Sequence, residues 1–345
     1  MAMKLAMKVS LLHQRKIKFS VCLSGMIVFV ASCGINPAVQ QPDTPTKAHK
    51  AERPASHTDL LALTGPLTVL SLNVAHGRKD AINQLMLSEQ TIHQNLNEVA
   101  AVLKHSNADI VALQEADGPS RWSGGFDHVA ALAQQANYPW HCRVGQARSW
   151  LFDYGTALLS RGYFTQTLGH SFTPTPPTTT KGFLLGQVAW QPRKGQPTTI
   201  LIDIISVHLD FSRSKVRQQQ VTEIMAVLSG RKNPIIILGD FNSEWLADDS
   251  VVVDLAKRAG LHSFQPDAEN LDTYKSGDRR LDWILISKEL EFKRYAVLPD
   301  IVSDHYAIIA EVGLTTAANI NTLAIDPSKL NNNPCGDNVT CNFCE

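Results

Sequence analysis

Apolar positions along the chain follow two different periods. Between Ile92 and Leu103 they recur every three or four residues, which is the spacing of one helix face, and Ser88 before them favours a helix start. Runs rich in β-branched residues predict strands instead. Strands are predicted at 68–73, 109–115, 140–147, 155–161, 164–171, 183–190, 198–208, 234–242, 281–287, 291–298 and 305–312, and further helices at 124–137, 221–228 and 250–260. This mixed order favours two packed sheets with helices outside over a purely parallel sheet.

The first 32 residues have the layout of a secretory signal. They hold five basic residues and no acid, followed by an 11-residue apolar run, Val21–Ala31, which is too short for a membrane-spanning helix of about 20 residues. The segment that ends at Cys33 resembles a bacterial lipobox, with an ordinary signal peptide and an incidental cysteine as the alternative. We therefore expect removal of 1–32, lipidation of Cys33 and a location in the bacterial cell envelope. By the same resemblance, Gly34 after the cysteine favours the outer membrane over the inner one, with the protein facing the periplasm or the surface.

Two polar segments flank one predicted domain at 66–313. Residues 33–65 carry four prolines and no hydrophobic period, which predicts a disordered tether. Residues 314–345 form an Asn- and Thr-rich tail, which contains Cys335, Cys341 and Cys344. Zinc is disfavoured because CxxC occurs once and no histidine is near. A disulfide is favoured in an exported protein, and Cys142 is one possible partner, although the pairing is not readable from the sequence.

Composition and charge narrow the class of protein. With 44% hydrophobic residues the chain has enough apolar material for a folded core. The 32 basic and 32 acidic residues balance, but removal of residues 1–32 leaves 27 basic and 32 acidic ones, a net charge of −5. A nonspecific polyanion binder gains affinity by neutralising phosphates with Lys and Arg. The charge therefore argues against that class, without excluding a local basic groove.

Polar residues gather where the predicted strands end. An isolated acid at the tip of a buried strand needs a partner, and several acids brought together would repel one another without a cation. Carboxylate and amide oxygens favour Mg²⁺, Mn²⁺ or Ca²⁺ over zinc. The residues concerned are Asn73, Gln114, Glu115, His208, Asp210, Asp240, Asn242, Asp282, Asp304 and His305.

Seven motifs in order resemble the endonuclease/exonuclease/phosphatase superfamily, which comprises deoxyribonuclease-like metal-dependent phosphoesterases. They are LNVAHG (72–77), DIVALQE (109–115), YGTALLSR (154–161), SVHLDF (206–211), ILGDFN (237–242), LDWILIS (281–287) and SDH (303–305). The set is more specific than any single motif because the order also matches. The resemblance implies an α+β fold, a four-layer α/β/β/α sandwich of two packed mixed β-sheets with outer helices.

The resemblance also implies a metal-ligand set. Glu115 is the expected principal ligand of Mg²⁺, Mn²⁺ or Ca²⁺. Asn73 and Asp304 are expected beside it, as ligands directly or through water. Whether one or two ions bind stays open.

The same resemblance implies catalytic roles. Asp240 is expected to align or deprotonate the attacking water, and Asn242, with Asn73, to donate to phosphate oxygens. His305 is expected to act as acid/base or to stabilise phosphate charge, held by Asp282. His208 is expected to donate to a non-bridging oxygen or to serve as a second acid/base. The choice of general base between Asp and His stays open.

Structural alternatives exist for most of these residues. Asn73 and Asn242 could cap backbone turns, a common use of asparagine. His208 could be a hydrogen-bonded core histidine, and Asp282 could belong to a buried ion pair. Asp210 could lie near the site or cap the following helix.

Several segments near the motifs also stay open. His76 could contact substrate or not. Residues 121–126 could touch a ligand or pack around a glycine turn, and residues 150–152 could form a lipid-facing patch or core. The Pro- and Thr-rich loop 171–181 is expected to rim the site, and Lys181 stands where some relatives carry an arginine.

The sequence therefore predicts a lipid-anchored, divalent-metal-dependent phosphoric ester hydrolase that acts as a monomer. A phosphodiesterase or phosphatase acting on phospholipid headgroups or small phosphoesters is the first hypothesis. A nuclease is the second, and the net charge leans against nucleic acid as a partner. A noncatalytic surface protein on the same fold is the third. Substrate choice is set by loops, which the shared motifs do not cover.

Overall fold

The computed structural model describes residues 62–193, 195, 198–326 and 339–343. The predicted signal peptide, Cys33 and most of the predicted tether lie outside these residues, as do Cys335 and Cys344. Within the described ranges, no helix has both the length and the apolar character needed to cross a membrane.

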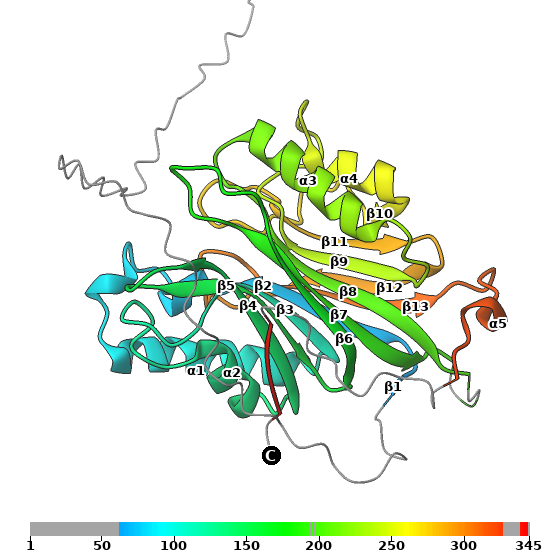
Figure 1. The fold of residues 1–345 in the computed structure, drawn as a ribbon, viewed down its shortest axis with the longest axis horizontal. Coiled ribbons are helices and arrows are strands. Elements are labelled where there is room, and N and C mark those ends of the chain that lie inside the picture. Colours follow the sequence, from blue (N-terminus) through cyan, green and yellow to red (C-terminus); the bar gives the residue numbers. More distant parts are fainter. Residues whose placement is uncertain (1–61, 194, 196–197, 327–338, 344–345) are drawn as a thin grey trace, which may run out of the picture. The chain divides into compact units, whose positions relative to one another are not determined.

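Two seven-stranded mixed sheets form the centre of the domain (Figure 1). The first, here the β2 sheet, has the order β12 (Leu290–Val297), β13 (Ile308–Leu314), β2 (Leu67–Asn73), β3 (Ile110–Asp117), β5 (Asp153–Ser160), β4 (Trp140–Arg148) and β14 (Thr340–Phe343). The second, here the β8 sheet, has the order β1 (Leu63–Thr64), β7 (Gly182–Gln191), β8 (Ile200–His208), β9 (Ile235–Asp240), β11 (Asp282–Ser287) and β10 (Leu261–Ser263), and β6 (Phe164–Ser171) also pairs with β7.

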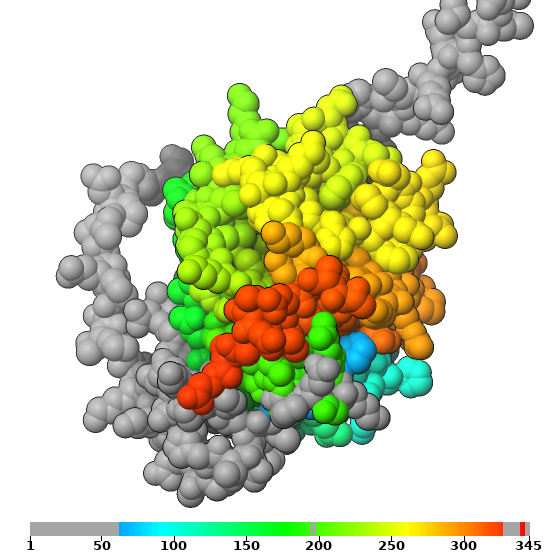
Figure 2. Space-filling view, turned by 90° about the vertical axis from the view of Figure 1, so that its right-hand side faces the viewer, coloured from blue at the N-terminus to red at the C-terminus, as the bar shows by residue number. Residues whose placement is uncertain are grey.

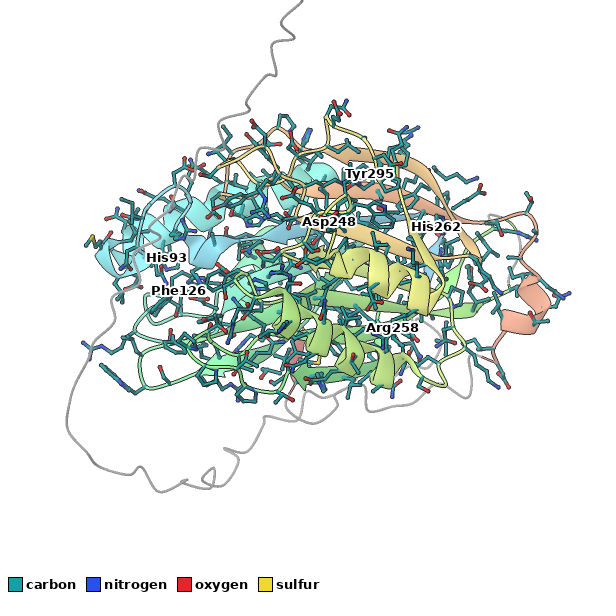
Figure 3. All side chains as sticks on the ribbon, turned by 90° about the horizontal axis from the view of Figure 1, so that it is seen from above. His93, Phe126, Asp248, Arg258, His262 and Tyr295 are labelled. Carbon is teal, nitrogen blue, oxygen red and sulfur yellow. A yellow bond between two sulfur atoms is a disulfide. The ribbon has the colours of Figure 1, made fainter. Side chains whose placement is uncertain are left out.

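Helices cover the outer face of each sheet (Figures 1 and 3). α1 (Glu89–Ser106) and α2 (His128–Gln135) pack on the β2 sheet, and α3 (Ser214–Leu228) and α4 (Val251–Ala259) pack on the β8 sheet. Leu158, Ile204 and Ile236 are fully buried between the sheets. The fold is thus the predicted four-layer α/β/β/α sandwich. Short helical turns complete it: η1 (Ala75–Gly77), η2 (Gln84–Met86) and α5 (Ile320–Leu323).

Local sequence explains where α1 begins and what it buries. The Ser88 hydroxyl accepts a hydrogen bond from the Thr91 backbone N–H at 3.1 Å, which satisfies a free donor of the first turn. Ile92, Leu96 and Val99 form the buried face that the periodicity predicts. At the start of the helix, His93 stacks on Phe126 with ring centroids 3.8 Å apart (Figure 3).

Several predicted boundaries were wrong, and the largest error is at α3, which begins at Ser214 instead of residue 221. α2 begins at His128 instead of residue 124, because Gly124 and Gly125 adopt positive φ and Asp127 caps the helix by accepting from the Ala130 N–H at 3.0 Å. β13 begins at Ile308 instead of residue 305. His305 lies in the preceding loop and makes an isolated bridge with Tyr274.

Part of the predicted tail packs against the domain. Ile320 in α5 is buried against the core between the sheets, and Ala324 forms a bridge with Ile200 at the start of β8. Figure 2 shows this segment, in orange-red, at the end of the domain where α5 lies. β14 adds an antiparallel strand to β4, and a Cys142–Cys341 disulfide joins the two strands.

The strand ends that carry the predicted chemistry meet at one edge. Asn73 at the end of β2 is in register with Gln114 of the parallel strand β3. In the other sheet, His208 at the end of β8 is in register with Asp240 of β9, and Asp240 with Asp282 at the start of β11. This edge of the sandwich is called the site edge below.

Candidate active site

Close packing of β8 and β9 sets the position of Asp240. A side chain at Gly239 would place its Cβ 2.0 Å from the Val207 carbonyl oxygen, and the φ of Gly239 is 151°. Only glycine fits there. The two sheets are also tied just beneath the site edge, since the Gln114 side chain donates to the Ser206 hydroxyl at 3.1 Å.

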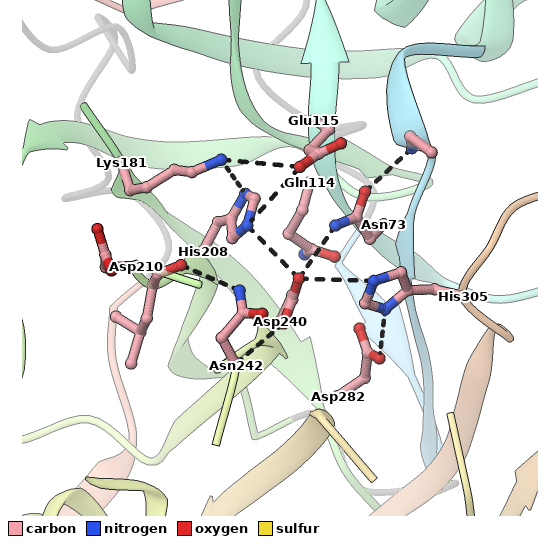
Figure 4. A network of polar contacts seen from close by, with 12 residues as sticks. Asn73, Gln114, Glu115, Lys181, His208, Asp210, Asp240, Asn242, Asp282 and His305 are labelled. Atoms are coloured by element: carbon pink, nitrogen blue, oxygen red, sulfur yellow. Dashed lines mark hydrogen bonds and ion pairs between the residues drawn. The ribbon is translucent and has the colours of Figure 1, made fainter. Parts of the chain in front are cut away.

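Asp240 lies at the centre of the polar network in Figure 4. Its Oδ2 accepts from Asn73 Nδ2 at 3.0 Å and lies 3.4 Å from His208 Nε2 and 3.8 Å from His305 Nε2. Its Oδ1 accepts from the Asn242 backbone N–H at 2.9 Å. Burial raises the pKa of this carboxyl to about 7. A carboxyl held in this way can orient a water molecule or take its proton.

His305 and Asp282 form a buried pair. His305 Nδ1 lies 2.8 Å from Asp282 Oδ2, so that the ring turns Nε2 towards Asp240. Burial lowers the pKa of His305, but the charges of Asp282 and Asp240 outweigh it and raise the pKa to about 10. The imidazolium is therefore the favoured form, and it can stabilise a phosphate anion or donate a proton.

His208 is held as a neutral hydrogen-bond donor. Its Nδ1 lies 3.5 Å from Lys181 Nζ, and an ammonium group can only donate, so Nδ1 accepts and Nε2 carries the hydrogen. Burial, and then the charge of Lys181, lower the pKa of His208 well below its ordinary value. The Nε2–H faces Asp240 and, at 3.9 Å, Glu115. This arrangement suits donation to an oxygen of a bound anion.

Lys181 is a site residue to which the sequence analysis assigned no role. Its side chain is 7% exposed and its Nζ lies 3.7 Å from Glu115 Oε1. Its position in the sequence, directly before the strand β7, could have indicated this role. The first residue of β7, Gly182, is in register with His208.

Glu115 projects from an irregularity in β3. The strand register shifts between Gln114 and Ala116, and Glu115 has a φ of 50°. Its carboxylate has three basic neighbours, His76, Lys181 and His208, at 3.2, 3.7 and 3.9 Å. Burial raises the pKa of Glu115, but these neighbours lower it well below the ordinary range. The carboxylate is thus ionised, as a metal ligand requires.

The other two expected metal ligands have protein partners. Asp304 pairs with the Arg78 guanidinium. Asn73 Oδ1 accepts from the Ala75 backbone N–H at 3.0 Å while its Nδ2 donates to Asp240. Asn73 therefore both caps a turn and orients the central carboxylate, and its role towards a metal stays a prediction.

The donor set of the site edge fits a hard divalent cation. In the described part of the chain, one group of three His, Cys, Asp or Glu side chains has its ligand atoms within 4.8 Å of one another: Asp240, Asp282 and His305. These residues were expected in catalysis, so the geometric cluster and the expected ligand set are different. The negative charge of Asp282 helps to raise the pKa of Asp240, and a cation would relieve that repulsion.

Asn242 and Asp210 serve the loops around the site. Asn242 Nδ2 donates to the Leu209 carbonyl at 3.1 Å (Figure 4), and its part in phosphate binding stays a prediction. Asp210 accepts from the N–H groups of Ser212 and Arg213, at 2.9 and 2.8 Å, and from Thr178 Oγ1 at 2.7 Å. Burial would raise the pKa of Asp210, but these hydrogen bonds lower it to about 2. Asp210 thus anchors the loops on either side of it.

Of the aromatic residues in 121–126 and 150–152, some are packed and one is exposed. Trp122 packs against Phe152, with ring centroids 5.6 Å apart, and against His76. Trp150 is 80% exposed. In the loop expected to rim the site, Thr179 Oγ1 lies 2.6 Å from the Tyr154 hydroxyl.

Comparison with known proteins identifies the family. The sequence model of the Endonuclease/Exonuclease/phosphatase family matches residues 70–305, and no curated protein sequence matches the chain. An endonuclease/exonuclease/phosphatase family protein from Leptotrichia buccalis is 18% identical with a TM-score of 0.56, covering 72% of this chain and all of its own. A mannosyl-6-phosphatase from Bacteroides thetaiotaomicron is 17% identical with a TM-score of 0.54, covering 71% and 99%. At these identities the structures establish the fold. The chain belongs to the endonuclease/exonuclease/phosphatase family of phosphoesterases and nucleases.

Proposed function

We propose that this protein is a divalent-metal-dependent phosphoric ester hydrolase with its active site at the site edge. The buried Asp240 carboxylate carries the proposal. Asn73 donates a hydrogen bond to Asp240 Oδ2. The neutral His208 and the positively charged His305 lie 3.4 and 3.8 Å from the same oxygen. A structural salt bridge requires no such arrangement.

The proposed mechanism assigns a step to each side chain. Asp240 orients the attacking water or takes its proton. The hydrogen bonds from Asn73 and from the Asn242 N–H hold its carboxylate in one orientation. His208 donates Nε2–H to a non-bridging oxygen. His305, oriented by Asp282, stabilises the developing phosphate charge or protonates the leaving group.

Glu115, Asn73 and Asp304 are the proposed metal-binding residues. For Asp304 to coordinate, the pair with Arg78 must open or share the carboxylate. A bound divalent cation supplies charge neutralisation on the phosphate oxygens. Mg²⁺ and Mn²⁺ match this oxygen-rich set, and Ca²⁺ is also compatible with it.

The surface around the site supports a membrane-associated substrate, a phospholipid headgroup in the first place. Seven large hydrophobic side chains are exposed among the described residues, and all lie in segments that connect strands. They are Ile82, Leu85, Met86, Trp150, Phe211, Leu246 and Ile301. Exposed apolar side chains that form a patch are typical of lipid or protein contact. Trp150 and Phe211 come within three residues of the ends of β4 and β8.

Basic residues near the site support the same choice over nucleic acid. Arg78, Lys79 and Lys275 are engaged with Asp304, Glu98 and Asp80, respectively. A nucleic-acid groove needs cations that are available to phosphates. Together with the net charge of −5 that the chain would have without residues 1–32, this favours phospholipids or small phosphoesters as substrates.

We also propose that acylated Cys33 anchors the protein in the cell envelope. Such an anchor would hold the enzyme at a lipid surface. The proposed location is the outer membrane, facing the periplasm or the surface, and the proposed state is a monomer.

A substrate panel tests the proposal. The purified protein is given bis-p-nitrophenyl phosphate, phospholipid vesicles, a sugar phosphate and plasmid DNA, each with Mg²⁺ and with EDTA. Turnover of the diester with Mg²⁺ but not with EDTA, and its loss in Asp240→Asn, supports the hydrolase. Faster cleavage of DNA than of phospholipid would favour the nuclease instead. Inactivity on every substrate would favour a noncatalytic protein.

A further inference from the structure

His76 is held in an unusual backbone conformation beside the site. Its φ is 57° and that of Ala75 is 45°, in the left-handed region that side chains other than glycine disfavour. The side chain is 10% exposed and its ring meets Tyr154 edge-on, with centroids 4.6 Å apart. The turn therefore directs this imidazole into the site at an energetic cost, which packing alone does not require.

The two ring nitrogens of His76 each face a carboxylate. Nδ1 lies 2.8 Å from Asp117 Oδ1, and Nε2 lies 3.2 Å from Glu115 Oε2. Asp117 is fully buried, and its second oxygen has no hydrogen-bond partner in the described structure. A carboxylate only accepts, so Nδ1–H donates to Asp117 and, without a metal ion, Nε2–H donates to Glu115. A metal ion bound at Glu115 would take the place of the Nε2 proton, because a histidine ligand must be deprotonated at the nitrogen that binds.

The spacing suits two ligands of one cation. With metal–ligand bonds of about 2.1 to 2.2 Å, adjacent octahedral ligands lie about 3.0 Å apart and tetrahedral ligands about 3.5 Å apart. The observed 3.2 Å between Nε2 and Oε2 falls in this interval. A histidine that binds metal commonly donates its other N–H to a carboxylate, as His76 does to Asp117. Lys181 lies on the other Glu115 oxygen, Oε1.

We propose that His76 Nε2 and Glu115 together bind the divalent cation, with Asp117 as the positioning residue for His76. This inference rests on the metal dependence proposed above and adds a nitrogen ligand to a set otherwise made of oxygen. Imidazole suits Mn²⁺ and later transition metals better than Mg²⁺, which keeps oxygen ligands and water. The chain is therefore expected to prefer Mn²⁺ over Mg²⁺ more strongly than an oxygen-only site does.

Mn²⁺ binding provides a test that does not depend on turnover. Apo-protein is titrated with Mn²⁺ alone, and the bound ion is examined by pulsed electron paramagnetic resonance for coupling to nitrogen. The wild type is expected to show histidine nitrogen coupling, which changes when ¹⁵N-histidine is incorporated. His76→Gln is expected to remove that coupling and to weaken Mn²⁺ binding by about 10- to 100-fold. The ratio of Mn²⁺ to Mg²⁺ affinity is expected to fall as well.

Matched variants separate His76 from the other histidines. Asp117→Asn is expected to keep the nitrogen coupling and to weaken binding in the same direction, by less than His76→Gln. His305→Gln and His208→Gln test the two other histidines near the carboxylates and are expected to keep the coupling. His141→Gln, a buried histidine in β4, is expected to leave both coupling and affinity unchanged and controls for altered stability.

Three results would overturn the inference, and the third would also contradict the proposed function. Nitrogen coupling that persists in His76→Gln but disappears in His305→Gln or His208→Gln would assign the ligand to that histidine. Wild-type Mn²⁺ binding without nitrogen coupling would leave His76 as an ion-pair partner of Glu115 only, with metal dependence intact. Absence of Mn²⁺ binding, together with activity that survives EDTA, would reject both the His76 inference and the proposed metal-dependent hydrolase.

Discussion

Removal of the His305 side chain is the most direct perturbation of the proposed mechanism. His305 reaches towards Asp240 with Nε2 and is held by Asp282 through Nδ1, so the variants are His305→Ala, Asp282→Asn and the double variant. General acid–base catalysis contributes about 10²- to 10⁴-fold. His305→Ala is therefore expected to lower kcat by at least about 10²-fold. The effect on KM should be smaller, because the contact strengthens in the transition state.

The strength of the Asp282–His305 hydrogen bond determines the loss of kcat expected for Asp282→Asn. It is a buried 2.8 Å hydrogen bond between groups that carry opposite charges when both are ionised. Such a bond contributes about 1.5 to 3 kcal/mol, so Asp282→Asn is expected to cost about 10- to 150-fold in kcat. Measured side by side, Asp282→Asn is expected to lose less activity than His305→Ala, because the histidine itself is still present. The double variant is expected to be little worse than His305→Ala, since Asp282 acts only through the histidine.

Initial rates on bis-p-nitrophenyl phosphate and thermal unfolding are measured on the same preparations. His141→Ala serves as the control, because His141 is equally buried but lies towards the end of β4 remote from the site edge. It is expected to lower Tm while kcat per folded molecule stays unchanged. If His305 and Asp282 were only structural, their variants would behave like this control. A well-folded His305→Ala protein within a few-fold of wild-type kcat would refute the reasoning.

Three further predictions concern the metal, the disulfide and the anchor. Exhaustive EDTA treatment is expected to abolish activity and Mg²⁺ or Mn²⁺ to restore it, whereas full activity in metal-free buffer would contradict the proposed cofactor. Cys341→Ser is expected to lower the free energy of unfolding by about 2 to 5 kcal/mol, because the bond to Cys142 links positions 199 residues apart. An unchanged Tm in oxidising buffer would contradict this. Mass spectrometry is expected to find an acylated N-terminal Cys33 in cell membranes, and a Cys33→Ser form that stays equally membrane-bound would reject lipidation.

Sequence patterns alone predicted the layers of the fold and the strand ends that carry polar groups. The apolar residues of α1 and the run before Asp240 each report on burial within a single element, and this information is local. Asp240 and Asp282 could be predicted as site residues from equally local information, because an acid next to a fully buried strand needs a partner. Local patterns were less successful at α2. Its paired glycines and the Asp127 cap place the start of the helix at His128, four residues after the predicted start.

The contacts that distinguish this site were decided by the tertiary structure. Lys181 lies beside His208 because β7 and β8 pair in one particular register, and His76 meets Asp117 because a left-handed turn follows β2. Arg78 reaches Asp304 across 226 positions of sequence, and Cys142 reaches Cys341 across 199. Such partners are chosen by strand register and by the packing of whole sheets, and the residues near each one in the sequence carry no trace of that choice. The sequence alone therefore determined which residue types stand at the strand ends, while the packed sheets determined which of them touch.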